Sequence, residues 1–436
     1  MSKLLTGAAI RDISPKQDYF PMESMFGETM VGIHNPLHVR AITLDDGNNK
    51  AVLITQELAG VEDPDRLVST ITTKYGLAEE YIFLQATHAH SVPMMGMFAF
   101  MNKECPPDIL KKNQELAEYV FEQTMAAVQE AFSNMVPSVI KYSCGQSYIN
   151  VNRSRDYYIR KRIPDEEIAT VEKQHGWKIR EEDGQQMYTS LGVNPTGPSD
   201  KTLSVLKFER ENGEPIAWFL NHSTHSTVMH RNVLGLYDSD FSGLTSLLIE
   251  KEYPGCVAAW TAGSSGDNDP IKLSDNITAN PETGISGYSK NQDPLDLLER
   301  VAYPHFEDFL QITRSMEILS DVTIKGATEI AEPQSVNPED PAKIEMSLLQ
   351  IGPVTLVGVH GELFTTIGLH MKKASKSDKT IIVSYNAKTS RNNAGYILDD
   401  EGLKNGAWGW QRFKAMPGTV QDAMTETMFQ MMQKAK

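Results

Sequence analysis

Two histidines stand two residues apart at the end of a short apolar segment. His88 and His90 follow the run 81–86, inside the sequence Thr-His-Ala-His-Ser. Side chains at positions i and i+2 of an extended segment lie on one face, so both imidazoles would point to one small volume. Imidazole nitrogens are common zinc ligands, and the spacing therefore fits a metal site. It also fits ordinary polar residues at a strand end, and other segments must decide between the two interpretations.

A second apolar run, 215–220, also ends in histidines. His222 and His225 follow it closely, and their spacing places them on different faces of an extended strand. We expect His225 to point into the same site and His222 to be hydrogen bonded in the core or behind the site. His230, further along the chain, is interpreted as a loop residue without a role in the chemistry.

Oxygen donors follow two more apolar runs. Glu362 lies after 354–359, and Tyr396 lies in a turn-rich segment after 380–383. A buried carboxylate costs several kcal/mol unless a cation or hydrogen-bond donors compensate it, whereas the helix N-terminus expected beside Glu362 contributes only about 0.3–1 kcal/mol. Two imidazoles, a carboxylate and a phenol form a donor set that favours zinc over magnesium or calcium.

Strands that are buried on both faces must position these residues. Continuous apolar, β-branched runs of this length are typical of such strands, and helical patterns lie between them. Strands are expected at 51–55, 81–86, 215–220, 354–359 and 380–383. Helices are expected at 63–73, 107–135, 241–253, 294–314, 364–374 and from 418 to the end. The alternation predicts an α/β fold of mixed, buried sheets with flanking helices and with the metal site at strand ends.

Composition and charge restrict the partners and the compartment. The 436 residues carry a formal net charge of -16, which disfavours phosphate backbones and anionic membrane surfaces, so nucleic acid is not expected as a partner. Cys105, Cys144 and Cys256 are too few and too far apart for a disulfide framework or a Cys-x-x-Cys metal site. No apolar stretch is long enough for a transmembrane segment, and the N-terminus lacks the apolar core of a secretory signal. A cytoplasmic location is expected, with secretion through a removed leader as the alternative.

Several motifs together resemble the neutral, non-lysosomal ceramidase family. They lie, in the family's order, at 7–15, 36–41, 87–91, 152–154, 202–208, 239–243 and 392–396. Each motif is short, and their common order along most of the chain carries the resemblance. It implies that residues 1–436 form a single ceramidase-like catalytic domain. Two stretches rich in charged and turn residues, 145–201 and 263–293, are expected to be long loops within it.

The resemblance also implies roles for individual residues. By position, zinc would be bound by His88, His225, Glu362 and Tyr396. This set agrees with the donors inferred from the strand ends. The resemblance further implies that His90 acts on the substrate side of the metal and that Arg153 contacts the substrate.

Two departures from the family's pattern concern catalysis and the substrate. Where the family has a Gly-Asp-x-Ser-Pro segment with a proposed nucleophilic serine, residues 266–270 read Gly-Asp-Asn-Asp-Pro. The nearby Ser264 and Ser265 do not lie in a nucleophile elbow, so we do not expect a serine nucleophile. A Met-rich segment, 92–98, replaces the expected Gly-rich turn, and its Met94 would line an apolar acyl or aryl pocket or simply pack inside the turn.

These residues predict a zinc-dependent hydrolase that cleaves the amide bond of an N-acyl compound with metal-activated water. His90 would donate to the oxyanion or move a proton, and Asp240 or Asp267 would orient a histidine or position the water. The substrate is expected to be a small molecule with an apolar acyl or aryl group. A homo-oligomer is compatible with the sequence.

Two other functional classes remain open at this point. One is a metal-dependent esterase, lactonase or phosphoesterase, which would hold a second ion if Asp240, Asp267 or Asp269 joined the site. A non-catalytic metal-binding protein would close the fourth coordination position instead of leaving it to a substrate.

Overall fold

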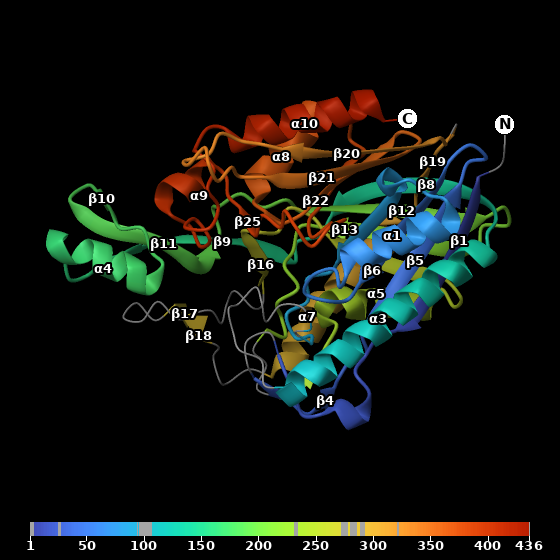
Figure 1. Cartoon of the computed structure of the whole chain (residues 1–436), viewed down its shortest axis with the longest axis horizontal. Coiled ribbons are helices and arrows are strands. Elements are labelled where there is room, and N and C mark those ends of the chain that lie inside the picture. The colour runs from blue at the N-terminus through green and yellow to red at the C-terminus, as the bar shows by residue number, and fades with distance from the viewer. Residues whose placement is uncertain are drawn as a thin grey trace.

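A large mixed sheet forms the centre of the structure, which is a computed structural model (Figure 1). The structure describes residues 4–24, 28–93, 95, 107–230, 234–271, 278–279, 286–287, 293–320 and 322–435. In spatial order, the sheet consists of β15 (Val257–Ala262), β13 (Pro215–His222), β12 (Thr202–Arg210), β8 (Val136–Gln146), β1 (Leu5–Asp12), β5 (His38–Asp45), β6 (Lys50–Gln56) and β7 (Ile82–Ala86), and β19 (Glu317–Ile318) also pairs with β8. The neighbours are mostly antiparallel, but the pairs β13–β15 and β6–β7 are parallel.

A second sheet packs face to face on the first. Its strands, in order, are β20 (Ile324–Ala331), β21 (Ile344–Ile351), β22 (Val354–Val359) and β24 (Thr380–Val383). The apolar core between the sheets includes Leu53 and Phe219 from the large sheet and Leu356 and Ile381 from the second. Burial of these facing side chains holds the two sheets together.

Helices cover the outer faces, so that the layers run helix, sheet, sheet, helix (Figure 1). The large sheet is covered by α1 (Pro64–Tyr75), α3 (Pro107–Ser133), α5 (Asp240–Glu252) and α7 (Pro294–Ile312). The second sheet is covered by α8 (Thr365–Ser375), α9 (Asp400–Asn405) and α10 (Val420–Lys434). The methionines of α10, among them Met424, Met428 and Met431, lie in this outer core.

The layered arrangement explains the continuous apolar runs of the sequence. On β6, Val52 and Ile54 face the helices, while Ala51 and Leu53 face the second sheet. Both faces of β6 are buried, which explains its continuous apolar run 51–54. The expected strands and helices, and the predicted α/β fold of mixed sheets with flanking helices, are confirmed.

Residues 145–201 form regular structure, so the prediction of a long loop there is wrong. They contain β9 (Asn150–Tyr158), α4 (Asp165–His175), β10 (Arg180–Glu182) and β11 (Gln185–Asn194). Together with β16 (Asn268–Pro270) the strands form a separate small sheet, which projects from the main body with α4 (Figure 1). This sheet is partly exposed, and its charged residues leave no apolar run to mark the strands. Most of the other expected loop, 272–277, 280–285 and 288–292, lies outside the described residues.

Short pairs of strands complete the described structure. They are β2 (Met22–Glu23) with β3 (Thr29–Met30), β4 (Gly32–Ile33) with β14 (Leu236–Tyr237), β17 (Thr278–Ala279) with β18 (Ser286–Gly287), and β23 (Glu362–Leu363) with β25 (Tyr396–Ile397). Two 3-10 turns, η1 (Gln17–Tyr19) and η2 (Glu79–Tyr81), lie before β2 and β7. In the part of the chain that the structure describes, no helix is both long and apolar enough to cross a membrane.

Backbone hydrogen bonds join the two sheets where the strands end. Ala86 N donates to the Tyr385 carbonyl at 3.2 Å, and Ala387 N donates to the Leu84 carbonyl at 3.0 Å. Ser384 N donates to the carbonyl of Ala262, the last residue of β15, at 2.9 Å. The segments that leave β7, β15 and β24 are thereby fixed against one another.

A buried ion-pair network ties β5 to the end of β6 and to α5. Arg40 is 1% exposed and donates to Glu57 and to Glu250, the latter at 2.7 Å from Nε. Although burial raises the pKa of the Glu57 carboxyl, the charge of Arg40 outweighs this effect and holds the pKa below its usual value. The second carboxylate also accepts from Ala258 N of β15, so one guanidinium links three elements of the fold.

We expect Arg40→Ala to destabilise the protein by about 3–5 kcal/mol, because it leaves a buried carboxylate without a counter-charge. Urea unfolding followed by circular dichroism measures the change. Arg300→Ala is the control, because Arg300 pairs with Asp296 on the surface of α7 and its removal should barely shift the unfolding midpoint. Equal shifts for the two variants would contradict a structural role for the buried network.

Candidate metal centre

His88 follows β7 and turns its ring into the interior. Its Nδ1–H donates to the Ala59 carbonyl, and since a carbonyl only accepts, the Nε2 atom carries the lone pair of the ring. The ring stacks on Tyr385 with 4.0 Å between centroids and 7° between planes. The backbone is left-handed at His88, with φ 58°, so the two histidines do not share a face of an extended strand as predicted. Their rings converge because the chain turns there.

His225 reaches the same place from the end of β13. Its Nδ1–H donates to the Ser265 carbonyl at 3.0 Å, which again leaves Nε2 as the atom with the lone pair. The side chain is fully buried, and Nε2 has no hydrogen-bond partner. His222 lies in the core, where its ring nitrogens contact Thr224 Oγ1 and the Ser147 carbonyl, in agreement with the prediction.

Glu362 and Tyr396 are brought together by a short parallel pairing of strands. In the β23–β25 ladder, Glu362 lies opposite Tyr396 and Leu363 opposite Ile397. Glu362 N donates to the Gly395 carbonyl at 2.7 Å, which fixes the register. The Tyr396 phenol hydrogen bonds to the Glu362 carboxylate. Two oxygen donors that are far apart in the sequence therefore lie side by side.

The imidazole and carboxylate atoms are spaced as ligands of one ion would be. Glu362 Oε2 lies 3.6 Å from His88 Nε2 and 3.4 Å from His225 Nε2. A tetrahedral ion with bonds of about 2.0–2.1 Å would hold its ligand atoms about 3.4 Å apart. These atoms fit a divalent cation such as zinc.

The electrostatics of this cluster also fit a bound cation. Burial raises the pKa of Glu362 to about 7, even though Arg153 and the hydrogen bond from Tyr396 oppose the shift. The Oε2 atom is buried and has no hydrogen-bond partner. Burial lowers the pKa of His88 to about 4 and that of His225 well below its usual value, so both rings are neutral at neutral pH and can act as ligands. A cation at this position would compensate the desolvated donors.

His90 lies beside the cluster but differs from His88 and His225 in the partner of its second ring nitrogen. Its Nε2 is 3.0 Å from His88 Nε2, and the possible ligand atoms of His88, His90 and His225 all lie within 4.8 Å of one another. Its other ring nitrogen faces the Nδ1 of His230 at 3.0 Å instead of a backbone carbonyl. This contact leaves His90 able to exchange a proton with His230, a residue that the sequence places in a loop without a role.

Tyr385 is a further component that sequence reasoning does not identify. It is buried, its ring covers His88, and its hydroxyl lies 3.4 Å from His225 Nδ1 and 3.5 Å from Ser265 Oγ. Burial raises the pKa of this phenol well above its usual value. Its place immediately after β24, like that of the other donors after their strands, is the signal that could have revealed it.

Arg153 lies behind the cluster, where its guanidinium is fully engaged. It pairs with Asp269 at 2.9 Å, donates to the Gly266 carbonyl at 2.8 Å, and donates to the Tyr396 hydroxyl at 3.3 Å. Only 4% of the residue is exposed, and it does not line the pocket described below. The structure places Arg153 against Tyr396 and Asp269, and the substrate contact that the resemblance implies stays a prediction.

Asp240 and Asp267 do not face the cluster. Asp240 accepts from the backbone amides of Val228, Met229 and Phe241, and burial raises its pKa to about 7. Asp267 accepts from the amide and hydroxyl of Thr365 at the start of α8, and burial raises its pKa to about 6. Both carboxylates hold segments that carry site residues, and their hydrogen bonds described here go to no imidazole. A role of either in positioning the water stays a prediction.

The serines near Gly266 serve the site through their backbone. The Ser265 carbonyl accepts from His225, and the Ser264 carbonyl accepts from the Thr365 hydroxyl. Ser264 Oγ is buried without a hydrogen-bond partner, so no imidazole is placed to activate it. This arrangement agrees with the expectation that no serine acts as a nucleophile.

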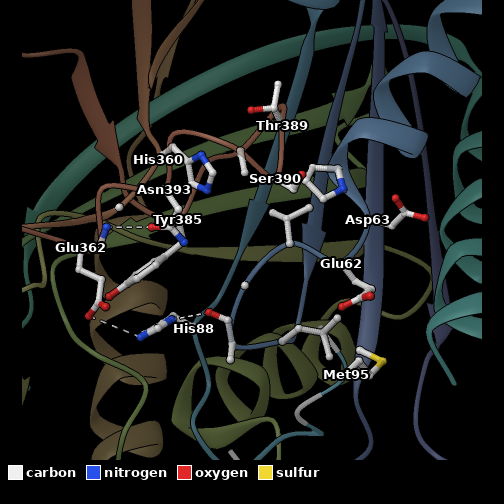
Figure 2. A pocket seen from close by; sticks show the side chains of 18 of the residues that line it. Glu62, Asp63, His88, Met95, His360, Glu362, Tyr385, Thr389, Ser390 and Asn393 are labelled. Atoms are coloured by element: carbon white, nitrogen blue, oxygen red, sulfur yellow. Dashed lines mark hydrogen bonds and ion pairs between the residues drawn. The ribbon is translucent and has the colours of Figure 1, made fainter. Parts of the chain in front are cut away.

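A pocket of about 420 Å³ opens beside the cluster (Figure 2). His88, Glu362 and Tyr385 form one end of it, and the segment Leu58–Pro64 forms much of the wall. Met95 also lines the pocket, whereas Met94 lies outside the described residues. Burial lowers the pKa of His360, another lining residue, to about 4.

Comparison with known proteins identifies the family. A model of the neutral/alkaline non-lysosomal ceramidase N-terminal domain matches residues 7–280, which is more than half of the chain. The fold is similar to that of neutral ceramidase from Pseudomonas aeruginosa, with a TM-score of 0.71 and 15% identity over 98% of this chain and 74% of that chain. A ceramidase complexed with C2 is similar over the same shares of both chains, with a TM-score of 0.67 and 15% identity. The chain belongs to the neutral/alkaline non-lysosomal ceramidase family.

Proposed function

We propose that this protein is a zinc-dependent hydrolase that cleaves the amide bond of an N-acyl compound. The observation that carries the proposal is the convergence of His88 Nε2, His225 Nε2 and Glu362 Oε2 at distances that suit one ion, with Tyr396 beside them. Each imidazole donates its other N–H to a backbone carbonyl, as zinc-binding histidines commonly do. The family and the related ceramidase structures support an amide as the bond that is cleaved.

The residues around the cluster can carry out the remaining steps. Zinc, when bound, would lower the pKa of a water to about 7 and polarise the scissile carbonyl. His88 and Glu362 line the pocket, so a substrate carbonyl can approach the cluster from that side. His90, in contact with His230, is placed to take a proton from the reacting water and pass it to the leaving amine, since burial lowers its pKa and leaves the ring neutral beforehand. Tyr385 keeps the ring of His88 in place by stacking.

A two-ion hydrolase and a non-catalytic metal-binding protein have less support, and the family favours an amide over the ester that a one-ion esterase or lactonase would cleave. A second ion would need carboxylates, but Asp240 holds backbone amides, Asp267 holds Thr365, and Asp269 pairs with Arg153. A closed, non-catalytic site would bury all its donors, whereas His88 and Glu362 border a cavity. These observations favour a single ion with access for a substrate.

The pocket wall suits an apolar acyl or aryl group beside the scissile amide. Leu58, Val61, Pro64, Pro93 and Met95 line it. Burial of such a group against these side chains would contribute about 25 cal/mol for each Å² of apolar surface. One solved relative is a ceramidase complexed with C2, which supports an N-acyl compound as the substrate. A cytoplasmic location is retained as part of the proposal.

We expect Glu362→Ala to lose both zinc and activity, because it removes the only carboxylate among the proposed ligands. The metal content should fall from about one zinc per chain to near zero, and kcat/KM toward N-acyl amides should fall more than about a hundredfold. Metal analysis and amide hydrolysis measure the two effects. The control is Glu339→Ala, at an exposed position. Full zinc occupancy and turnover in Glu362→Ala would refute the assignment.

We expect the double variant Ser264→Ala, Ser265→Ala to keep kcat within about threefold of the parent, because metal-activated water needs no serine nucleophile. Both serines act through backbone carbonyls that the substitution preserves. Loss of a true nucleophile would lower kcat by several orders of magnitude. A loss of that size in a folded, zinc-loaded variant would instead indicate a covalent mechanism.

A further inference from the structure

Tyr385 supplies a hydrogen-bond donor at the end of the pocket that meets the metal cluster. His88, Glu362 and Tyr385 line that end. The N–H of the His88 ring is already bonded to the Ala59 carbonyl, and a carboxylate that acts as a metal ligand only accepts hydrogen bonds. The phenol of Tyr385 carries an O–H, and Figure 2 shows this end of the side chain pointing toward Glu362. Of these three side chains, Tyr385 is therefore the one that can donate to a bound substrate.

The hydroxyl of Tyr385 makes only long contacts with the protein. It lies 3.5 Å from Ser265 Oγ and 3.4 Å from His225 Nδ1. The second contact cannot accept the phenol hydrogen, because Nδ1 of His225 already carries the hydrogen that it donates to the Ser265 carbonyl. Hydrogen bonds between hydroxyl groups are usually about 2.5–3.0 Å long, so Ser265 Oγ is a weak acceptor. Within the described part of the chain, the phenol hydrogen therefore has no strong acceptor and stays available to a ligand.

The protein holds the ring of Tyr385 in a fixed and unfavourable conformation. Its backbone is left-handed, with φ 56°, which is uncommon for a bulky side chain. Its N–H donates to the Gly361 carbonyl and its own carbonyl accepts from Ala86 N, both at 3.2 Å, while the ring stacks on His88. Strained conformations that the surroundings maintain are concentrated at functional sites. The hydroxyl is thus oriented before a substrate binds.

An oriented donor at this position suits the hydrolysis of an amide. When water attacks the amide carbon, the carbonyl oxygen gains negative charge. A donor that already points at this oxygen stabilises the charged transition state more than it stabilises the neutral substrate. Because the substrate carbonyl would approach the cluster from the pocket side, its oxygen would come within reach of the Tyr385 hydroxyl.

We propose that the hydroxyl of Tyr385 donates a hydrogen bond to the carbonyl oxygen of the scissile amide and that Tyr385 is a catalytic residue. The inference rests on the proposed function and assigns a further role within the same site. No bond to the phenol oxygen forms or breaks, and the transfer of a proton to the leaving amine stays with His90. The stacking on His88 is a separate property of this side chain, because it needs the ring and not the hydroxyl.

The variant Tyr385→Phe removes the hydroxyl and keeps the ring. With N-dodecanoylethanolamine and N-benzoylethanolamine as test substrates, we expect kcat to fall about a hundredfold or more and KM to change less than about threefold. The zinc content should stay at about one per chain, since the stacking on His88 remains. The control is Tyr142→Phe, a buried tyrosine of β8 outside the pocket whose hydroxyl donates to the Asp378 carbonyl at 2.9 Å, and its kcat should stay within about twofold of the parent.

Binding of a transition-state analogue gives a readout that does not depend on turnover. In a phosphonamidate analogue of the dodecanoyl amide, a tetrahedral phosphorus with a charged oxygen replaces the planar carbonyl group. Calorimetry should show that Tyr385→Phe weakens the binding of this analogue by about the same factor as kcat/KM. In a crystal structure of the zinc-loaded parent with the analogue, the phenol oxygen of Tyr385 should lie about 2.5–3.0 Å from a phosphonamidate oxygen.

The outcomes keep the two proposals apart. Failure of the zinc-loaded parent to hydrolyse either amide would overturn the proposed amide hydrolase itself. Full kcat and unchanged analogue binding in Tyr385→Phe, with a parent that hydrolyses the amides, would overturn only the role of the hydroxyl. Loss of activity together with loss of zinc would also count against it, because the phenol would then serve the metal site. If the variant does not fold, the parent structure decides, and a phenol oxygen more than about 4 Å from every analogue oxygen would contradict the proposal.

Discussion

The structure depends on one constraint: a few ligand atoms of the metal cluster are buried away from water. His225 Nε2 and Glu362 Oε2 are buried without hydrogen-bond partners, and the burial of Glu362 is costly enough to raise its pKa to about 7. The neighbouring protein groups hold these atoms in place and give them no hydrogen-bond partner. The second nitrogen of each imidazole is held by a backbone carbonyl, so neither ring can rotate to find another partner without losing a bond. A cation compensates such a set without any movement of the protein.

The two packed sheets make that arrangement rigid. A slip of one residue in a strand with both faces buried would exchange the side chains that pack in the two cores, so the points where these strands end are fixed by packing. Backbone hydrogen bonds then join the segments after β7, β15 and β24 to one another. Asp240 and Asp267 accept hydrogen bonds from backbone amides of adjoining segments, so these buried acids hold the segments beside the site in place.

The sequence predicts the parts of this design that depend on a continuous pattern. Apolar runs mark the buried strands, and the residues directly after them include His88, His225 and Glu362, which the fold brings together. A residue whose role depends on packing between distant segments cannot be identified from these runs. Tyr385 matters because its ring stacks on His88, and Arg153 lies behind the site because Asp269 pairs with it there. The strands within 145–201 are partly exposed, so they lack the apolar run that reveals the others.

The pairing of β23 with β25 has a consequence for how this chain can vary. Its register sets Glu362 opposite Tyr396, and a slip of one residue would put Gly395 or Ile397 in place of the phenol. Neither replacement has an oxygen on its side chain. This pairing does not fix the number of residues between Glu362 and Tyr396. The intervening backbone only has to leave β23 and come back to pair as β25. Related proteins can therefore differ in the length of that intervening segment while the register of two short strands stays the same.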